Sequence, residues 1–469
     1  AGQVLSSTGT ALDWIDAAAG GGVEGSNSVY VTPSGTAAQN GVLLLSGLTS
    51  AIAKISTVTV PGSNVAMNQY NPGGPNSFDC FAQNTVNFSV GPQYQATFQG
   101  VQVLITVTSV QPFGPDTFQC NITTLAGGSV NISGSPDFPS PATTSITPST
   151  LIIAPGDYSI ASDFILNNLV NVTSLTGQAD VNITTSNVKI QSGANSSSNP
   201  ISIVGLNLTT SLFIQSSLSF LSFKNCKALG SNSFSIEPSG TGSITGKFED
   251  CTGAFRSFGG GVGVTAAGLF VRCKIDTTVT NGGAFGGKGS TSGKFEYCGG
   301  ALIQSSGTAF IPGNAFCNEG LTCAGYFYYC TAGSGSFGSS NTAATSAEFY
   351  NCIGGSTSFA YRNTNNDGKF YSCTSLSDNC FGSSPLSGDL AANAEYYNCS
   401  ARSIAVNAIG ISSEFYNCHA VASWNGYSAG NNGLAYNCSF GSFGGQNAPS
   451  GTGKYRNCLD SNFALVNQG

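Results

Sequence analysis

A short pattern of apolar and polar residues recurs through the second half of the chain. In its clearest copies it reads F-Y-N-C. Alternate residues of a strand share a face, so Phe and Cys, three residues apart, cannot both point inward along one straight strand. Asn tolerates a left-handed backbone better than most residues. The pattern therefore predicts a strand with Phe inside and Tyr outside, a corner at Asn, and a second strand that starts with an inward Cys.

The copies of this pattern define three sets of equivalent positions. Eleven copies end at Cys226, Cys251, Cys273, Cys298, Cys330, Cys352, Cys373, Cys399, Cys418, Cys438 and Cys458. The inward position three residues earlier holds Phe223, Phe248, Phe270, Phe295, Phe327, Phe349, Phe370, Tyr396, Phe415 and Tyr455, with Ala435 as the small exception. Asn occupies the corner at Asn225, Asn351, Asn398, Asn417, Asn437 and Asn457. A second inward aromatic is predicted at Phe234, Phe258, Phe337 and Phe359.

The spacing of the copies indicates a solenoid. Successive cysteines lie 19 to 32 residues apart, with a period near 22, and a regular period of this size is typical of stacked coils. Only 8% of residues are charged, but 30 Phe and 17 Tyr supply ample apolar surface for an interior. We therefore predict an all-β protein whose coils bury large side chains, each worth about 1.5–3 kcal/mol.

Short strands, an Asn corner and an internal Phe stack together resemble the right-handed parallel β-helix of the pectin-lyase type. The stretch Ser149-Thr-Leu-Ile-Ile-Ala-Pro-Gly-Asp-Tyr-Ser159 is similar to the opening coil of that architecture. The resemblance implies a β-helix of about 22 residues per coil over residues 141–469. Fold alone does not fix an activity.

The front of the chain lacks the cysteine period. Its opening, from Ala1 to Trp14, resembles a linker motif of bacteriophage tail fibres, which implies an N-terminal attachment or linker segment over residues 1–54. Helix-forming residues are scarce outside stretches such as Leu43 to Lys54. Strand-like alternation from Tyr94 to Thr108 predicts a small β-sandwich-like domain over residues 55–140.

The cysteines divide into two groups. The eleven at the repeat position are expected to form a column of small buried thiols. Disulfides are expected only outside the column, between Cys317 and Cys323 and between Cys80 and Cys120. His419, the single histidine, is expected to be a filler beside the cysteine column, and we predict no metal site and no cofactor.

Charge and hydropathy exclude several classes of partner. The net charge is −7 without a basic stripe, which argues against nucleic-acid binding. No apolar run reaches membrane-spanning length, so no membrane partner is expected. We expect no signal peptide, and assembly in a host cytoplasm that keeps the thiols reduced.

Tyrosine recurs at the outward position two residues before Cys, which predicts an exposed aromatic strip. The strip comprises Tyr328, Tyr350, Tyr371, Tyr397, Tyr416 and Tyr436. Exposed aromatic patches usually mark binding surfaces. A subunit interface, contact with a glycan, and structural filling are the three interpretations.

Candidate catalytic residues are few. Glu395 and Glu414, one coil apart, could place their carboxylates at the separation of about 5 Å that suits a retaining glycosidase. An ion-pair column is the alternative for the charged residues at this position, which include Glu348 and Lys369. Arg272, Lys274 and Asp276 form a second, weaker cluster that could serve a lyase.

These observations lead to three hypotheses of function. The first, implied by the resemblances, is a tail-fibre or tailspike-like structural appendage on the virion surface. It would recognise host surface polysaccharide, contact other virion proteins through its N-terminus, and form a homotrimer. The second is a polysaccharide depolymerase, a hydrolase or lyase, on the same β-helix. The third is an extracellular adhesin or fibre subunit. We expect a binding protein rather than an enzyme.

Overall fold

The computed structural model separates the chain into two compact units, which we describe in turn. It describes residues 3–7, 12–16, 28–53, 58–59, 65–69, 77–82, 93–98, 101–110, 117–124, 137–138, 142–143, 149–166, 170–190, 201–214, 220–237, 240–276, 285, 289–300, 304–305, 309–310, 316, 322–333, 337, 344–355, 358–359, 365–376, 381, 391–405, 412–425, 433–441, 454–459 and 464–468. Unit 1 comprises Ala1–Ile160, Ile165–Thr176 and Gly193–Ile201, and unit 2 the rest.

Unit 1 contains the opening coil and the one helix among the described residues. Strand β12 (Ser149–Ile153) lies between β3 (Ser28–Val31) and β15 (Val170–Ser174), parallel to both. Helix α1 (Ala37–Ala53) packs against β3, β12 and β13 (Gly156–Ser159). Its buried apolar side chains are Leu44, Leu48 and Ala51, and the buried Asn40 donates from Nδ2 to Asp157 O at 2.9 Å. The buried face of the helix thus covers β3, β12 and β13.

Local sequence explains where α1 begins and how closely it packs. Thr36 and Gln39 form a capping box, in which the Thr36 N–H donates to Gln39 Oε1 at 2.6 Å. A Cβ at Gly41 would lie 1.9 Å from the Ser159 carbonyl oxygen, and one at Gly47 would lie 2.3 Å from Val31 Cγ2. Both glycines allow the helix backbone to approach the strands. The predicted boundary at residue 54 places β3 and α1 in a different segment from the opening coil. In the structure β3 pairs with β12 of that coil, and α1 packs against both strands.

The remaining strands of unit 1 form a hairpin and one antiparallel sheet. The hairpin pairs β1 (Gln3–Ser7) with β2 (Leu12–Asp16), within the segment predicted as a linker. The sheet has the order β10-β5-β6-β9-β8-β7-β11-β4. All of its described strands belong to one hydrogen-bonded sheet, and the predicted sandwich-like domain over residues 55–140 stays a prediction. The strands are β4 (Val58–Thr59), β5 (Val65–Gln69), β6 (Ser77–Ala82), β7 (Gln93–Phe98), β8 (Val101–Val110), β9 (Thr117–Thr124), β10 (Asp137–Phe138) and β11 (Ala142–Thr143).

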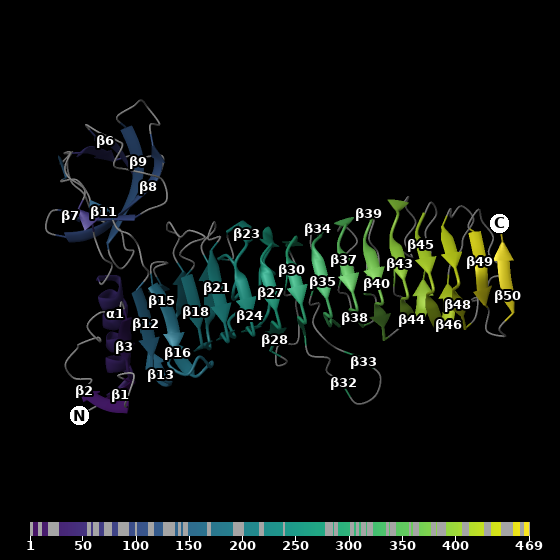
Figure 1. Cartoon of the computed structure of the whole chain (residues 1–469), viewed down its shortest axis with the longest axis horizontal. Coiled ribbons are helices and arrows are strands. Elements are labelled where there is room, and N and C mark those ends of the chain that lie inside the picture. Colours follow the sequence, from purple (N-terminus) through teal and green to yellow (C-terminus); the bar gives the residue numbers. More distant parts are fainter. Residues whose placement is uncertain are drawn as a thin grey trace. The chain divides into compact units, whose positions relative to one another are not determined.

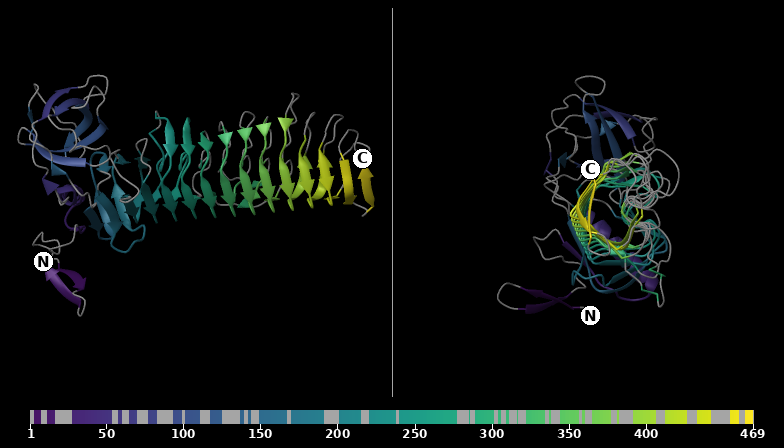
Figure 2. Two further views of the ribbon diagram at one scale, coloured as in Figure 1. Left: turned by 45° about the horizontal axis from the view of Figure 1, so that its top comes forward. Right: turned by 90° about the vertical axis from the view of Figure 1, so that its right-hand side faces the viewer.

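Unit 2 is a parallel β-solenoid, with turns of about 24 residues, close to the predicted 22. Figure 1 shows its strands as successive coils from teal to yellow, and the coils superpose when viewed end-on (Figure 2). The first long ladder contains β21 (Leu221–Lys224), β24 (Lys247–Glu249), β27 (Leu269–Val271), β30 (Lys294–Glu296), β35 (Tyr326–Tyr328), β37 (Glu348–Tyr350), β40 (Lys369–Tyr371), β43 (Glu395–Tyr397), β45 (Glu414–Tyr416), β47 (Leu434–Tyr436) and β49 (Lys454–Leu459). The all-β class and the parallel β-helix are thus confirmed.

Two further sets of strands complete the coils. One precedes the first ladder: β23 (Gly242–Ile244), β26 (Val264–Ala266), β29 (Ser290–Thr291), β34 (Thr322–Cys323), β36 (Ala344–Thr345), β39 (Asn365–Asn366) and β42 (Ala391–Ala392). The other follows the corner: β22 (Lys227–Ala228), β25 (Thr252–Gly253), β28 (Lys274–Ile275), β31 (Gly299–Gly300), β38 (Ile353–Gly354), β41 (Thr374–Ser375), β44 (Ser400–Ala405), β46 (His419–Asn425) and β48 (Ser439–Phe440). The remaining strands are β14 (Phe164–Leu166), β16 (Val181–Thr184), β17 (Asn187–Ile190), β18 (Ile201–Val204), β19 (Leu206–Leu208), β20 (Ser211–Ile214), β32 (Gln304–Ser305), β33 (Ala309–Phe310) and β50 (Leu465–Gln468).

Two stacks of aromatic rings fill the interior of unit 2. The first runs from Phe223 to Phe415, with neighbouring centroids 4.5 to 5.2 Å apart. The second runs from Phe234 to Phe381 with spacings of 4.8 to 5.0 Å, and rings of the two stacks meet edge to face. The second stack includes three rings that the sequence analysis did not identify, Phe285, Phe316 and Phe381.

The corner before each column cysteine has a left-handed backbone in every coil. The eleven corner residues have φ between 51° and 55°, and we call them the corner column: Asn225, Asp250, Arg272, Tyr297, Tyr329, Asn351, Ser372, Asn398, Asn417, Asn437 and Asn457. Asn417 Nδ2 donates to Asn398 Oδ1, and Asn437 Nδ2 donates to Asn417 Oδ1, both at 3.2 Å. The predicted Asn corner is confirmed, and three of its amides are linked along the column.

The cysteine column lies directly inside these corners. Its eleven side chains are at most 2% exposed and are thiols. Ten of the eleven thiols donate to the carbonyl of the inward residue one coil earlier, as Cys352 Sγ does to Phe327 O at 3.4 Å, whereas Cys251 Sγ donates to Glu249 O of its own coil. Burial raises the pKa of the Cys251 and Cys273 thiols, which favours the neutral, unreactive form.

The disulfides predicted outside the column are wrong. Cys120 and Cys323 are buried thiols rather than halves of disulfides. Cys120 lies opposite Phe78 in the pairing of β6 with β9, while Cys80 lies opposite Phe118, so Cys80 and Cys120 are not directly opposite. Cys323 contacts Thr291 Oγ1 at 3.8 Å in the preceding coil. The side chains of Cys80, Cys317 and Cys380 lie outside the described residues.

Candidate functional site

The outer surface of the ladder from β21 to β49 carries most of the candidate residues, and we call it the ladder face. On each strand the outward positions lie four and two residues before the column cysteine, with the inward residue between them. Parallel in-register pairing places equivalent residues of neighbouring coils side by side, as in Tyr350↔Tyr371 and Glu395↔Glu414. A repeated outward residue therefore becomes a continuous row.

Five of the six strip tyrosines form a continuous stack on this face. Tyr328, Tyr350, Tyr371, Tyr397 and Tyr416 have centroids 4.7 to 5.1 Å apart and interplanar angles of 6° to 9°. We call them the tyrosine ladder. Tyr436 lies opposite Tyr416 and is 38% exposed.

Stacking limits what the tyrosine ladder can contact. The three middle rings each have a neighbouring tyrosine on both faces, so only their edges and hydroxyl groups meet solvent. At the N-terminal end of the tyrosine ladder, Lys294 Nζ of the preceding coil lies 5.1 Å from the centroid of the Tyr328 ring. A ligand along the ladder therefore meets ring edges and polar groups rather than open ring faces.

A row of glutamates fixes several of the tyrosine hydroxyls. Tyr350, Tyr397 and Tyr416 each donate to the glutamate two residues earlier, with oxygen–oxygen distances of 2.5, 3.0 and 2.7 Å. The bond to Glu414 and burial raise the pKa of Tyr416 to about 12, and burial with the bond to Glu395 raises that of Tyr397 to about 12. The hydroxyls remain protonated and oriented at neutral pH.

The two catalytic candidates lie in this row. Glu395 and Glu414 are opposite each other, one coil apart, as the sequence predicted. Glu395 also pairs with Lys369, at 3.2 Å between Nζ and Oε1, so part of the ion-pair interpretation holds at this position. Both carboxylates are held by a tyrosine of their own coil and lie on the solvent-facing side of a strand, outside the groove described below. The geometry brings them together without enclosing them.

Two of the lyase candidates have ion-pair partners outside the predicted cluster. Arg272 forks onto Asp250, with Nε–Oδ1 and Nη2–Oδ2 distances of 2.7 and 2.8 Å, and its Nη2 also donates to Glu249 at 2.8 Å. Asp276, which follows β28, pairs with Lys227 at 3.4 Å. Arg272 and Asp276 are thus held by different residues of earlier coils.

Two tyrosines in the corner column were missed by the sequence analysis. Tyr297 and Tyr329 have φ of 54°, are 59% and 49% exposed, and stack at 4.9 Å with an angle of 4°. A left-handed backbone costs a non-glycine residue about 1–2 kcal/mol. The signal was present in the sequence, since the motif reads E-Y-C and Y-Y-C where other copies have Asn before Cys.

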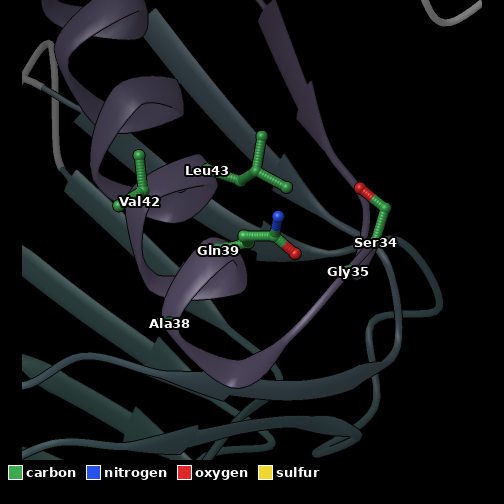
Figure 3. Close-up of a pocket in the computed structure, with 6 residues that line it drawn as sticks. All are labelled: Ser34, Gly35, Ala38, Gln39, Val42 and Leu43. Carbon is green, nitrogen blue, oxygen red and sulfur yellow. The ribbon is translucent and has the colours of Figure 1, made fainter.

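Unit 1 has a groove beside α1. It is lined by Ser34, Gly35, Ala38, Gln39, Val42 and Leu43 (Figure 3). Figure 3 shows the Gln39 amide directed toward the turn at Gly35, where it completes the helix cap. The lining thus offers exposed apolar side chains and few polar groups for a small ligand.

Other chemistry is limited in the part of the chain that the structure describes. No three His, Cys, Asp or Glu side chains there gather to hold a metal ion. Helix α1 is not suited to crossing a membrane by its length and hydropathy. His419 is exposed, and its Nδ1 lies 2.6 Å from Ser439 Oγ. The prediction that it fills space beside the cysteine column is therefore wrong.

Comparison of the chain with protein-family models, with curated proteins and with solved structures finds no match.

Proposed function

We propose that this chain is a receptor-binding appendage of the viral tail-fibre type, which holds host surface glycan against its ladder face. The observation that supports this most is the row of tyrosine hydroxyls oriented by glutamate carboxylates, present in three of the four coils from β37 to β45. A polysaccharide also repeats, so several of its units can engage successive coils at once.

The chemistry of the ladder face favours a hydrated glycan over a tightly packed subunit. Glu348, Lys369, Glu395 and Glu414 lie opposite one another in successive coils, in a row beside the ladder tyrosines. Covering these charges with a dry protein surface carries a desolvation penalty, because charged groups lose their water. Sugar hydroxyls and bridging waters can instead replace the lost hydrogen bonds.

The tyrosine row itself provides a test of this proposal. We expect Tyr371→Ala combined with Tyr397→Ala to weaken binding to a host envelope polysaccharide at least tenfold, because two hydroxyls and the orientation of Glu395 are lost. Binding is measured by calorimetry and oligomeric state by light scattering. Tyr30→Ala is the matched control, since Tyr30 is 44% exposed in β3 and lies outside the ladder face.

Two results would contradict the proposal. Unchanged binding in the double variant would reduce the ladder to a structural role. Loss of the oligomer with the glycan affinity per chain unchanged would indicate a subunit interface instead.

A polysaccharide depolymerase is the second candidate. The opposed carboxylates of Glu395 and Glu414 favour it. A depolymerase would create new reducing ends when incubated with the polysaccharide, and the Glu414→Gln variant would not. A binding appendage creates no new reducing ends in either form.

A further inference from the structure

The corner column changes its chemistry at two successive coils. Elsewhere it holds Asn, Asp, Ser or Arg, but after β30 and β35 it holds Tyr297 and Tyr329. Asn and Asp accept a left-handed backbone readily, and bulky residues do not. Two adjacent strained tyrosines at an exposed position point to a functional demand on their rings.

These two rings present surfaces that the tyrosine ladder lacks. They cover each other on one side only, and the next corner residues are Arg272 before Tyr297 and Asn351 after Tyr329. The Arg272 guanidinium is held away from Tyr297 by its bonds to Asp250 and Glu249 in the preceding coil. The outer face of each ring is therefore open to a ligand.

The neighbouring residues extend the aromatic surface without adding net charge. Tyr326, at the outward start of β35, is 48% exposed. Two neighbouring cations already have carboxylate partners: Lys294 pairs with Glu296 at 2.5 Å, and Arg272 pairs with Asp250 at 2.7 Å. Neither of these two cations is therefore free to select an acidic ligand.

We infer that Tyr297 and Tyr329 form a stacking subsite for an uncharged pyranose residue of the glycan. The open rings pack against the C–H face of the sugar, and the phenolic hydroxyls bond its hydroxyl groups. The subsite lies beside Tyr328, so a chain held there continues onto the tyrosine ladder. This inference rests on the proposed function.

The corner column supplies a substitution that separates binding from folding. In Tyr297→Asn combined with Tyr329→Asn, each ring is replaced by the residue that the column prefers. We expect the melting temperature of the full chain to be unchanged or higher, and affinity for a neutral polysaccharide to fall at least tenfold. Ser372→Asn is the control, because it places the preferred Asn at another position of the corner column without removing a ring.

The probes are dextran, mannan and galactan as neutral polymers and polygalacturonate as an acidic one, each titrated by calorimetry. Binding of a neutral polymer by the native chain, lost in the double variant and kept in Ser372→Asn, supports the subsite. Equal binding by the double variant overturns the subsite and leaves the proposed function standing, as does binding of polygalacturonate alone. No binding of any polymer by the native chain counts against both.

A second measurement locates the contact. Tetranitromethane nitrates exposed tyrosines, and mass spectrometry identifies the sites. The bound neutral polymer should slow nitration of Tyr297 and Tyr329 but not of Tyr30. Equal nitration rates with and without the polymer overturn the inference.

Discussion

Phe349→Ala is expected to lower the free energy of unfolding of the solenoid by about 3–5 kcal/mol, the range for removing a buried ring. Phe349 is fully buried between Phe327 and Phe370, with both centroids 4.8 Å away. It also meets Phe337 edge to face at 5.6 Å. The substitution thus leaves a cavity and removes contacts from both stacks at once.

Guanidinium unfolding followed by tyrosine fluorescence measures this effect. The matched control is Tyr436→Ala. Tyr436 lies in β47, a strand of the same sheet as Phe349, and its outward side chain is 38% exposed. This control substitution should cost well under half as much. Equal losses for the two variants would contradict the assignment of Phe349 to the interior.

Asn417→Val is expected to lower the free energy of unfolding by about 1.5–3.5 kcal/mol. A branched side chain in the left-handed region costs about 1–2 kcal/mol, and the lost amide contributes a further 0.5–1.5 kcal/mol, roughly. Asn417 has φ of 54° and bonds to the amides of Asn398 and Asn437. The residue is exposed, so burial adds nothing to the expected loss.

Asn417→Gly separates the two contributions. Glycine adopts the left-handed backbone without strain but cannot bond along the column. Its expected cost is about 0.5–1.5 kcal/mol, measured by the same unfolding experiment. If Val and Gly destabilise equally, the left-handed corner is not what the Asn provides.

The coil was predictable from sequence because its cues are local and strictly in register. The separation of Phe349 from Cys352 rules out one straight strand, and Asn351 between them supplies the corner. The bond from Tyr397 to Glu395 could also have been predicted, since residues two apart in a strand share a face. These features depend on neighbours within one turn of chain.

Features that depend on variable loops or distant partners were not predicted. Phe285 and Phe316 follow their column cysteines at longer and unequal distances, so they fall outside the repeat. Strand β3 pairs with β12 more than a hundred residues later, and no local pattern marks such a partner. Parallel pairings of this kind are set by tertiary contacts.

The candidate site was predictable in position but not in the surface it presents. Sequence placed Tyr350 and Tyr371 outward, and they lie there. Their mutual stacking, which covers the ring faces, depends on side-chain orientation and not on spacing. Tyr297 and Tyr329 were overlooked because tyrosine is unfavourable at a left-handed corner, which is also why they are informative.

Thiol titration tests the solenoid most directly. The chain has 16 cysteines, and the 13 described ones are buried thiols. In the folded protein we predict that no more than the other three, Cys80, Cys317 and Cys380, react with Ellman's reagent, and that all 16 react in guanidinium. Prompt reaction of most thiols without denaturant would contradict a cysteine column inside stacked coils.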